Sequence, residues 1–263
     1  MIFRYKGGHS TVSTDAQLAR ELADTAGATL VALREDTDLV GAVLKDAGDR
    51  ASQEVLSRLL AERRPDDAVL SEEAADDPAR LTARRVWIID PLDGTREFSE
   101  VPRTDWAVHV ALWEDGGLVA GAVARPAAGL TYATDGPVER PVGRPQRIRL
   151  AVSRTRPPRF VTALGGVLDA ELVAMGSAGI KAMAVLADEV DAYVHAGGQY
   201  EWDSAAPVAV AQAAGLHTSR IDGSPLTYNQ ANPSLPDLVI CRPEIAQEIL
   251  AAIANLTTKE DIA

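Results

Sequence analysis

The chain has 263 residues, and its sequence predicts an α/β protein built from two different parts. In the first part, two amphipathic helices precede a run of strand-like segments, an order typical of an α+β domain. In the second part, strand-like and helical segments alternate, as in an α/β domain. A stretch rich in proline, glycine and arginine at 135–147 separates the two patterns. We therefore predict an α+β domain over 1–140 and an α/β domain over 141–263.

The first part begins with helices. Thr14 and Gln17 have the spacing of a capping box, which predicts a helix of about 20 residues from this point. A second amphipathic helix is expected over 49–63. Residues 1–13 precede these elements and are expected to form a loose arm. Apolar runs bounded by turn residues then predict strands, the last three of them antiparallel, at 68–70, 85–90, 106–113, 117–125 and 130–134.

The second part shows strands and helices in alternation. The sequence predicts its strands near 148–152, 172–175, 191–195 and 217–220, and its helices near 158–165, 178–187, 203–214 and 243–255. Cys241 is the single cysteine, so no intrachain disulfide can form, and we expect it to be buried near a strand end.

Composition limits the classes of partner. The net charge of −12 disfavours binding to nucleic-acid polymers or membrane surfaces, which requires a basic face. No segment reaches the roughly 18 apolar residues of a membrane span. The first 14 residues lack the apolar core of a signal peptide. With a single cysteine, these features lead us to expect a soluble cytoplasmic protein.

The segment from Trp87 to Thr95 carries the strongest chemical signal. An apolar strand ends in two carboxylates, Asp90 and Asp93, and Gly94 and Thr95 then open a short helix. Carboxylate oxygens suit Mg²⁺, and backbone N–H groups at a helix start favour phosphate. The segment therefore predicts metal-assisted phosphate chemistry, although a helix-capping aspartate in a tight turn would have the same sequence.

Three more acidic positions lie where predicted elements begin or end. Asp49 falls in the first turn of its helix, where it would also favour the helix dipole. Glu72 and Glu73 follow a strand, although adjacent glutamates are often simply solvated. Asp203 precedes a helix and would also serve as its N-cap. Each local explanation is adequate for its own residue, but the four acidic sites together need a common cause.

The motifs around these positions, in this order, resemble those of the inositol monophosphatase superfamily, which comprises metal-dependent, lithium-sensitive phosphomonoesterases. The resemblance covers about residues 15–250 and implies a layered α-β-α-β-α sandwich. Within the superfamily, the chain is most similar to the actinobacterial CysQ branch of 3′(2′),5′-bisphosphate nucleotidases. The superfamily motifs are 48–49 (GD), 71–73 (SEE), 90–95 (DPLDGT) and 202–207 (WDSAAP), and the branch segments are 105–109, 153–158, 176–183 and 195–203.

The resemblance implies two or three Mg²⁺ ions per site, with Mn²⁺ as a substitute and inhibition by Li⁺. A metal-activated water is then the nucleophile. Asp49 or Glu72, paired with the Thr95 hydroxyl, takes its proton. The implied ligands are Glu72, Asp90 and the Leu92 carbonyl for the first metal, Asp90, Asp93 and Asp203 for the second, and Asp49 with Glu72 for the third.

The implied substrate is adenosine 3′,5′-bisphosphate, or its sulfated form, which would lose its 3′-phosphate. Inositol-1-phosphate, fructose-1,6-bisphosphate and a 2′- or 3′-phosphorylated nucleoside remain alternatives, because the family uses one metal site for many substrates. A non-enzymatic anion- or metal-binding regulator is less favoured, since every ligand position is filled. The expected substrate contacts are Asp93, Gly94, Thr95, Ser153, Arg154, Ser177, Lys181 and Asp203.

Smaller expectations concern neighbouring residues and assembly. Arg156 is expected to add positive charge beside Arg154, and Tyr200 either stacks on a base or packs in the core. His195 is expected to be structural, and His109 is given no role. The resemblance is compatible with a homodimer.

Overall fold

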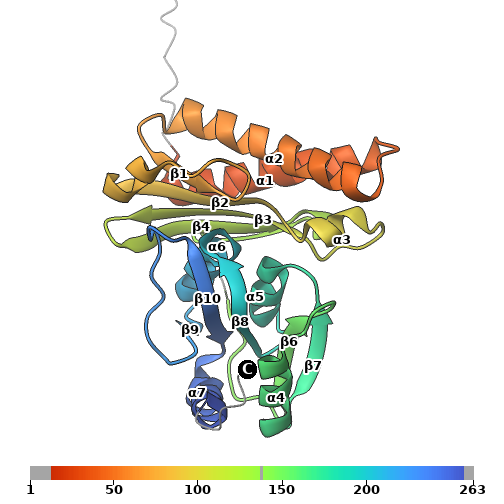
Figure 1. Cartoon of the computed structure of the whole chain (residues 1–263), viewed down its shortest axis with the longest axis vertical. Helices are drawn as coiled ribbons and strands as arrows, with labels where there is room; N and C mark the ends of the chain where they lie inside the picture. Colours follow the sequence, from red (N-terminus) through yellow and green to blue (C-terminus); the bar gives the residue numbers. More distant parts are fainter. Residues whose placement is uncertain (1–12, 137–138, 258–263) are drawn as a thin grey trace, which may run out of the picture.

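The computed structural model describes residues 13–136 and 139–257. Two five-stranded sheets are stacked with helices between and outside them, which gives five layers in the order α-β-α-β-α (Figure 1). This arrangement confirms the predicted fold class. The expected N-terminal arm at 1–13 lies, except for its last residue, outside the described residues. None of the described helices is long and apolar enough to cross a membrane.

The outer layer on the first sheet consists of α1 (Asp15–Glu35) and α2 (Gly41–Arg63). The capping box of Thr14 and Gln17 is confirmed, and α1 buries one apolar face against β3 and β4. The predicted start of α2 at residue 49 was wrong by about two turns. Its N-cap, Val40, makes no side-chain hydrogen bond, so the sequence carries no capping signal at this point. Asp49 consequently lies inside the helix and not in its first turn.

The first sheet has the strand order β1-β2-β3-β4-β5. Strand β1 runs parallel to β2, and the remaining neighbours are antiparallel, as predicted for the last three strands. The bounds are β1 (Ala68–Ser71), β2 (Arg85–Asp93), β3 (Ala107–Glu114), β4 (Gly117–Arg125) and β5 (Leu130–Ala133), with α3 (Thr95–Ser99) and the 3₁₀ segments η1 (Pro78–Thr82) and η2 (Pro126–Ala128) between them.

The second sheet has the order β7-β6-β8-β10-β9, with β6 parallel to β7 and β8. Its strands are β6 (Arg149–Ser153), β7 (Glu171–Met175), β8 (Ala192–Tyr200), β9 (His217–Ser219) and β10 (Ser234–Cys241). The sequence did not predict β10, which contains Pro236, although Cys241 is buried at its end as expected. Pairing with β10 also extends β8 past its predicted end near residue 195.

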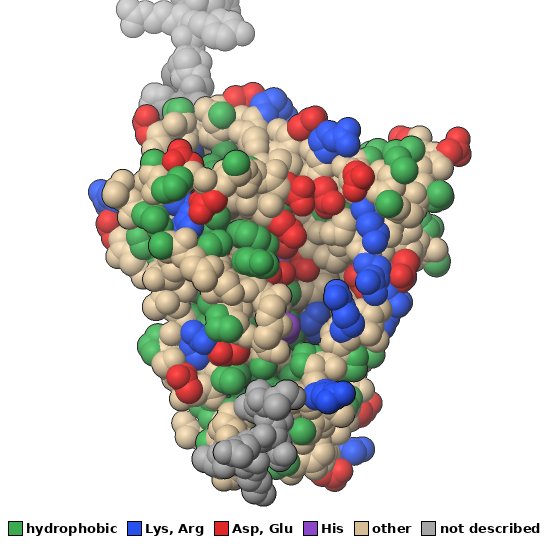
Figure 2. Space-filling view, viewed as in Figure 1, with side chains coloured by type: hydrophobic (Ala, Val, Ile, Leu, Met, Phe, Trp, Pro, Cys, Tyr) green, Lys and Arg blue, Asp and Glu red, His purple; other side chains and the backbone are tan. Residues whose placement is uncertain are grey.

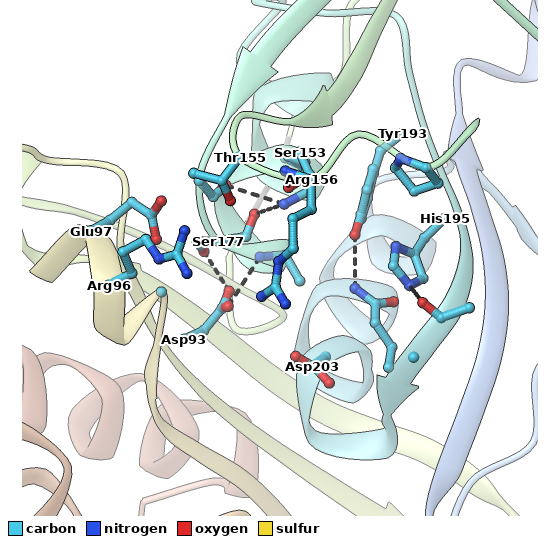
Figure 3. A pocket seen from close by; sticks show the side chains of 18 of the residues that line it. Asp93, Arg96, Glu97, Ser153, Thr155, Arg156, Ser177, Tyr193, His195 and Asp203 are labelled. Carbon is cyan, nitrogen blue, oxygen red and sulfur yellow. Dashed lines mark hydrogen bonds between the residues drawn. The ribbon is translucent and has the colours of Figure 1, made fainter. Parts of the chain in front are cut away.

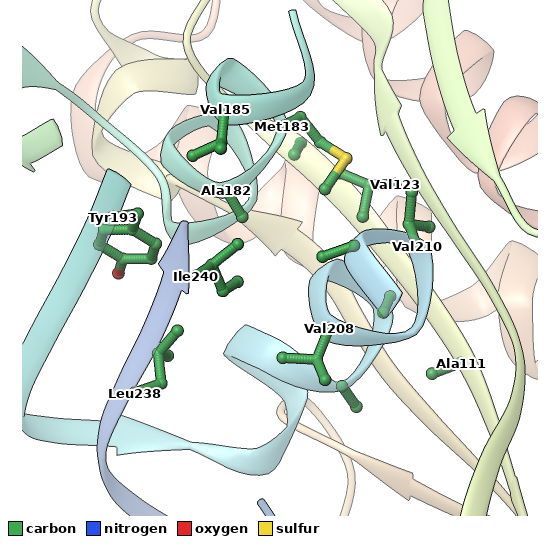
Figure 4. Packing of buried hydrophobic residues seen from close by; sticks show 14 of the residues in the cluster. Ala111, Val123, Ala182, Met183, Val185, Tyr193, Val208, Val210, Leu238 and Ile240 are labelled. Carbon is green, nitrogen blue, oxygen red and sulfur yellow. The ribbon is translucent and has the colours of Figure 1, made fainter. Parts of the chain in front are cut away.

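Helices α5 (Ala178–Leu186) and α6 (Glu201–Ala213) form the middle layer, and α4 (Arg159–Val167) and α7 (Pro243–Thr257) cover the far face of the second sheet (Figure 1). Apolar side chains from α5, α6 and both sheets form one buried cluster, which includes Met183, Val208 and Ile240 (Figure 4). The domain division at residue 140 stays a prediction. Because α6 packs against β2, β3 and β4, its first turn lies beside the end of β2.

Candidate functional site

The end of β2 presents two carboxylates on the same side of the strand. Side chains three positions apart on a regular strand point to opposite faces. Here the pairing with β3 is irregular between Asp90 and Asp93. The Leu92 N–H donates to Asp90 Oδ1 at 3.0 Å, and the Ser52 hydroxyl donates to the Pro91 carbonyl at 2.6 Å. The irregularity at Pro91 thus brings both aspartates to one face.

Asp203, in the first turn of α6, completes a group of three carboxylates. Asp90, Asp93 and Asp203 each offer one oxygen, and these oxygens lie within 4.8 Å of one another. Asp90 and Asp93 are buried. An all-oxygen set of anionic ligands is the type that binds hard divalent cations. The residues therefore fit a metal site of the predicted kind.

The electrostatics of the cluster lead to the same conclusion. Burial, followed by repulsion from Glu72 and Asp93, raises the pKa of Asp90 well above its usual value. Burial, and then Asp93, raises the pKa of Asp203 to about 6. Glu72 is exposed as a residue, but partial burial of its carboxyl, together with Asp203 and Asp93, raises its pKa to about 7. Such a group must bind protons or a cation to offset its mutual repulsion.

Asp93 is the exception, because the protein holds its carboxylate in the ionised form. Burial alone would raise its pKa, but His109 and other partners hold the pKa below the usual range. The N–H groups of Ala178 and Gly179 donate to its two oxygens at 3.0 and 2.6 Å, and the Ser177 hydroxyl also donates to it. The Asp93 carboxylate therefore lies against the N-terminus of α5, and it remains charged without a metal.

The proposed proton acceptors lie around this cluster. Thr95 begins α3, and its hydroxyl donates to the Leu92 carbonyl at 3.2 Å. Gly94 precedes it with a φ of +85°, which an L side chain rarely adopts. Asp49 lies on α2 beside Glu73, and burial followed by repulsion from Glu73 raises its pKa to about 7. Both carboxyls predicted as bases therefore titrate near neutral pH.

A cavity of about 520 Å³ opens beside Asp93 and Asp203 (Figure 3). In the space-filling view, acidic side chains gather where the two halves of the molecule meet, and Lys and Arg side chains lie beside them (Figure 2). Arg96 from α3 and Arg156 from the loop after β6 line the cavity and extend toward Asp93 (Figure 3). Neither makes an ion pair with another residue in the described part of the chain. The sequence reasoning missed Arg96, although its place directly after Thr95 would have indicated it.

Of the substrate contacts predicted around the end of β6 and at the start of α5, three line the cavity and one does not. Ser153, Ser177 and Lys181 line the cavity. The Lys181 ammonium is buried and donates to the carbonyls of Gly176 and Ser177, and burial lowers its pKa. Arg154 instead donates to Glu97 and Glu100 at 2.9 and 2.7 Å. Arg154, Ser177 and Lys181 thus all make hydrogen bonds within the protein, and their contact with substrate stays a prediction.

Two aromatic positions also bear on the site. Tyr200 stacks on Trp202 with ring centroids 4.8 Å apart, so its ring already has an aromatic partner. His109, to which the sequence gave no role, is fully buried beside the cluster, with Nε2 3.1 Å from an Asp93 oxygen. One signal in the sequence could have indicated it, because it is the only titratable residue inside the apolar segment 106–113. Its neighbour in the β-ladder is Asp90.

The sequence of this chain is similar to a family of known proteins over almost its whole length. A sequence model described as the inositol monophosphatase family matches residues 12–258. A 3′-phosphoadenosine 5′-phosphate phosphatase of Mycobacterium leprae is 56% identical and covers 92% of this chain and 94% of its own. The 3′(2′),5′-bisphosphate nucleotidase CysQ of Escherichia coli K12 is 32% identical, covering 79% of this chain and 91% of its own.

Solved structures show the same fold. An IMPase of Thermotoga maritima aligns with a TM-score of 0.75 at 20% identity, over 92% of this chain and 98% of its own. SuhB of Mycobacterium tuberculosis aligns with a TM-score of 0.71 at 27% identity, over 94% and 97% of the two chains.

Proposed function

The chain belongs to the inositol monophosphatase family of metal-dependent phosphatases, and we propose that it removes the 3′-phosphate of adenosine 3′,5′-bisphosphate with Mg²⁺ as cofactor. One observation carries this proposal: the three-aspartate cluster opens into a cavity that is also lined by Arg96 and Arg156, neither of which pairs with a carboxylate among the described residues. The names of the relatives at 56% and 32% identity support the same substrate. The sulfated form of the nucleotide is a second candidate at the same site.

The metal ligands follow from the motif. Glu72, Asp90 and the Leu92 carbonyl would hold one Mg²⁺, Asp90, Asp93 and Asp203 a second, and Asp49 with Glu72 a third. When bound, Mg²⁺ polarises the phosphoryl oxygens and makes a water nucleophilic at neutral pH. Because Asp93 remains ionised without metal, whereas Asp90 and Asp203 have raised pKa values, Asp93 provides the fixed negative charge of the site.

Residues of the chain itself would accept the proton of the attacking water and bind the phosphate oxygens. Asp49 or Glu72, paired with the Thr95 hydroxyl, would take the proton of the attacking water: Thr95 Oγ accepts it while passing its own proton to the carboxylate, and the pKa of either carboxyl near 7 suits a base at neutral pH. The backbone N–H groups of Gly94 and Thr95 lie at the start of α3, where they can donate to the phosphate oxygens.

The second phosphate would be recognised by Arg96 and Arg156. A guanidinium forms bidentate hydrogen bonds with phosphate, and both side chains extend into the cavity (Figure 3). Their positive charge also offsets the acidity of the protein as a whole at this one place.

The first experiment measures Mg²⁺-dependent phosphate release from four substrates: adenosine 3′,5′-bisphosphate, inositol-1-phosphate, fructose-1,6-bisphosphate and a nucleoside 2′-phosphate. We expect the nucleotide bisphosphate to lead in kcat/KM by about tenfold or more, which corresponds to about 1.4 kcal/mol in transition-state binding. A different leading substrate would contradict the proposed specificity and leave the metal chemistry intact.

The two arginines are tested by substitution. Arg96→Met and Arg156→Met should each lower kcat/KM for adenosine 3′,5′-bisphosphate by about tenfold or more, because each removes a charged phosphate contact. Both variants should act on adenosine 3′-monophosphate nearly as the parent does. Arg144→Met is the matched control, since Arg144 lies outside the cavity and pairs with Glu248. Equal losses on both substrates would show that the arginines do not read the second phosphate.

We further propose that Mn²⁺ substitutes for Mg²⁺, that Li⁺ inhibits, and that the protein acts in the cytoplasm as a homodimer. Metal titrations of activity test the first two proposals. Sedimentation of the purified chain tests the assembly.

A further inference from the structure

His109 lies between Asp93, at the end of β2, and the first turn of α6, which carries Asp203. It belongs to β3 and is completely buried. Its Nε2 is 3.1 Å from an Asp93 oxygen at the end of β2, and its Nδ1 is 3.1 Å from the Trp202 carbonyl in the first turn of α6. Trp202 immediately precedes Asp203 in the chain. The imidazole therefore contacts one proposed metal ligand directly and the backbone beside another.

Both contacts of the ring are with oxygen acceptors. Nδ1 also lies 4.0 Å from an Asp90 oxygen. Nδ1 is hydrogen-bonded to the Trp202 carbonyl, whereas Nε2 faces the Asp93 oxygen at 3.1 Å without the alignment of a hydrogen bond. Rotation of the ring would break the Nδ1 hydrogen bond and would move Nε2 away from Asp93.

The surrounding backbone also fixes the ring. A Cβ atom on Gly179 of α5 would lie 2.0 Å from His109 Nε2, so only glycine leaves room for the imidazole. The Gly179 N–H in turn donates to Asp93 at 2.6 Å. Three elements, β2, α5 and α6, therefore meet at this one side chain from β3.

We propose that His109 is a positioning residue that sets the spacing between the metal ligands Asp93 and Asp203 by bridging the end of β2 and the first turn of α6. The inference rests on the proposed metal-dependent function and adds a determinant of metal affinity. Asp93 and Asp203 belong to elements more than 100 residues apart in the sequence, so no local hydrogen bond can fix their separation. Side chains that orient metal ligands typically account for about 10- to 100-fold in metal affinity.

The test measures Mg²⁺ affinity by calorimetry in the folded, full-length protein, without substrate. His109→Leu keeps the volume but removes both ring nitrogens and their contacts, and we expect the Kd for Mg²⁺ to rise by about 10- to 100-fold. His109→Gln keeps a donor at one end of the side chain and should show a smaller rise. His217→Leu, the same change at a half-buried histidine of β9, should leave the Kd unchanged.

A second variant displaces the ring without changing it. Gly179→Ala inserts a methyl group where Nε2 lies, and it should also weaken Mg²⁺ binding by about tenfold. Gly165→Ala is its steric control, because the added methyl would lie 2.6 Å from the end of the Leu172 side chain, far from the site. The control should leave the Kd for Mg²⁺ unchanged.

The outcomes are distinguishable. If folded His109→Leu binds Mg²⁺ with the parent's affinity, the positioning role is overturned and the proposed function stands. If the parent itself binds no divalent cation, the proposed metal chemistry fails first. If His109→Leu does not fold, NMR of the parent protein tests the positioning role instead. The ring N–H signals of His109 should exchange slowly with solvent and shift when Mg²⁺ is added, and signals unaffected by Mg²⁺ would overturn the inference.

Discussion

Removing one charge from the acidic cluster should make the metal-free protein more stable. Asp203 is an informative position because burial and Asp93 raise the pKa of its carboxyl to about 6, compared with 3.8 for the free side chain. In the absence of metal above pH 6, the carboxyl is already ionised in the unfolded chain, and folding must bury this charge beside Asp93, which costs free energy. Asp203→Asn removes this cost and retains an oxygen that can accept the Tyr200 N–H, now bonded at 2.7 Å.

The magnitude follows from the pKa values. A shift from 3.8 to about 6 corresponds to about 3 kcal/mol at pH 8, so we expect Asp203→Asn to raise the free energy of unfolding by about 2–3 kcal/mol in EDTA. For a chain of this length the melting temperature should rise by about 4–10 °C. The sign depends on pH in a defined way. Below pH 3.8 both states are protonated and the variant has no advantage, whereas between 3.8 and about 6 the advantage grows as pH rises.

Thermal denaturation in EDTA at pH 4, 6 and 8 measures this effect, and Asp237→Asn is the matched control. Burial would raise the pKa of Asp237, but Arg220 holds it below its usual value, so the same substitution there should lower the melting temperature at pH 8. Adding Mg²⁺ should stabilise the parent and not Asp203→Asn. The reasoning is refuted if metal-free Asp203→Asn melts below the parent at pH 8.

Three further predictions concern the metal site and the packing between β4 and α6. Asp90→Asn should retain the fold but lose roughly several orders of magnitude in kcat, because a buried ligand of the metal cluster is removed; substantial phosphatase activity would contradict the site. Mg²⁺ should raise the parent's melting temperature more at pH 8 than at pH 5.5, because protons compete with metal at Glu72 and Asp49, whose pKa values are about 7; an equal gain at both pH values would oppose this view. Gly121→Ala should cost about 1–3 kcal/mol in urea denaturation, since its methyl would lie 2.7 Å from the Ala209 Cβ, whereas Gly117→Ala, which meets nothing within 4 Å, should cost little; equal costs would rule out the packing argument.

Local sequence signals predicted most elements well, and the failures have identifiable causes. The capping box placed the start of α1, because the Thr14 and Gln17 side chains satisfy the backbone locally. The start of α2 was missed because Val40 gives no such signal. Strand β10 was missed because it contains Pro236, which argues against a strand in the sequence. The structure accommodates this proline at an irregularity in the pairing with β8, beyond the part of β10 that pairs with β9.

The sequence by itself determined the fold class and the kinds of residue that form the site, because carboxylates at fixed spacing in specific motifs indicate metal chemistry wherever they occur. Only the tertiary structure decided how these residues are used. It shows that Asp93 is held ionised by α5 and His109, and that Lys181 and Arg154 donate hydrogen bonds to other protein groups. It also leaves Arg96 free to face the cavity. The reason is physical: the pKa and the available hydrogen bonds of a side chain depend on neighbours that folding brings together from distant parts of the chain.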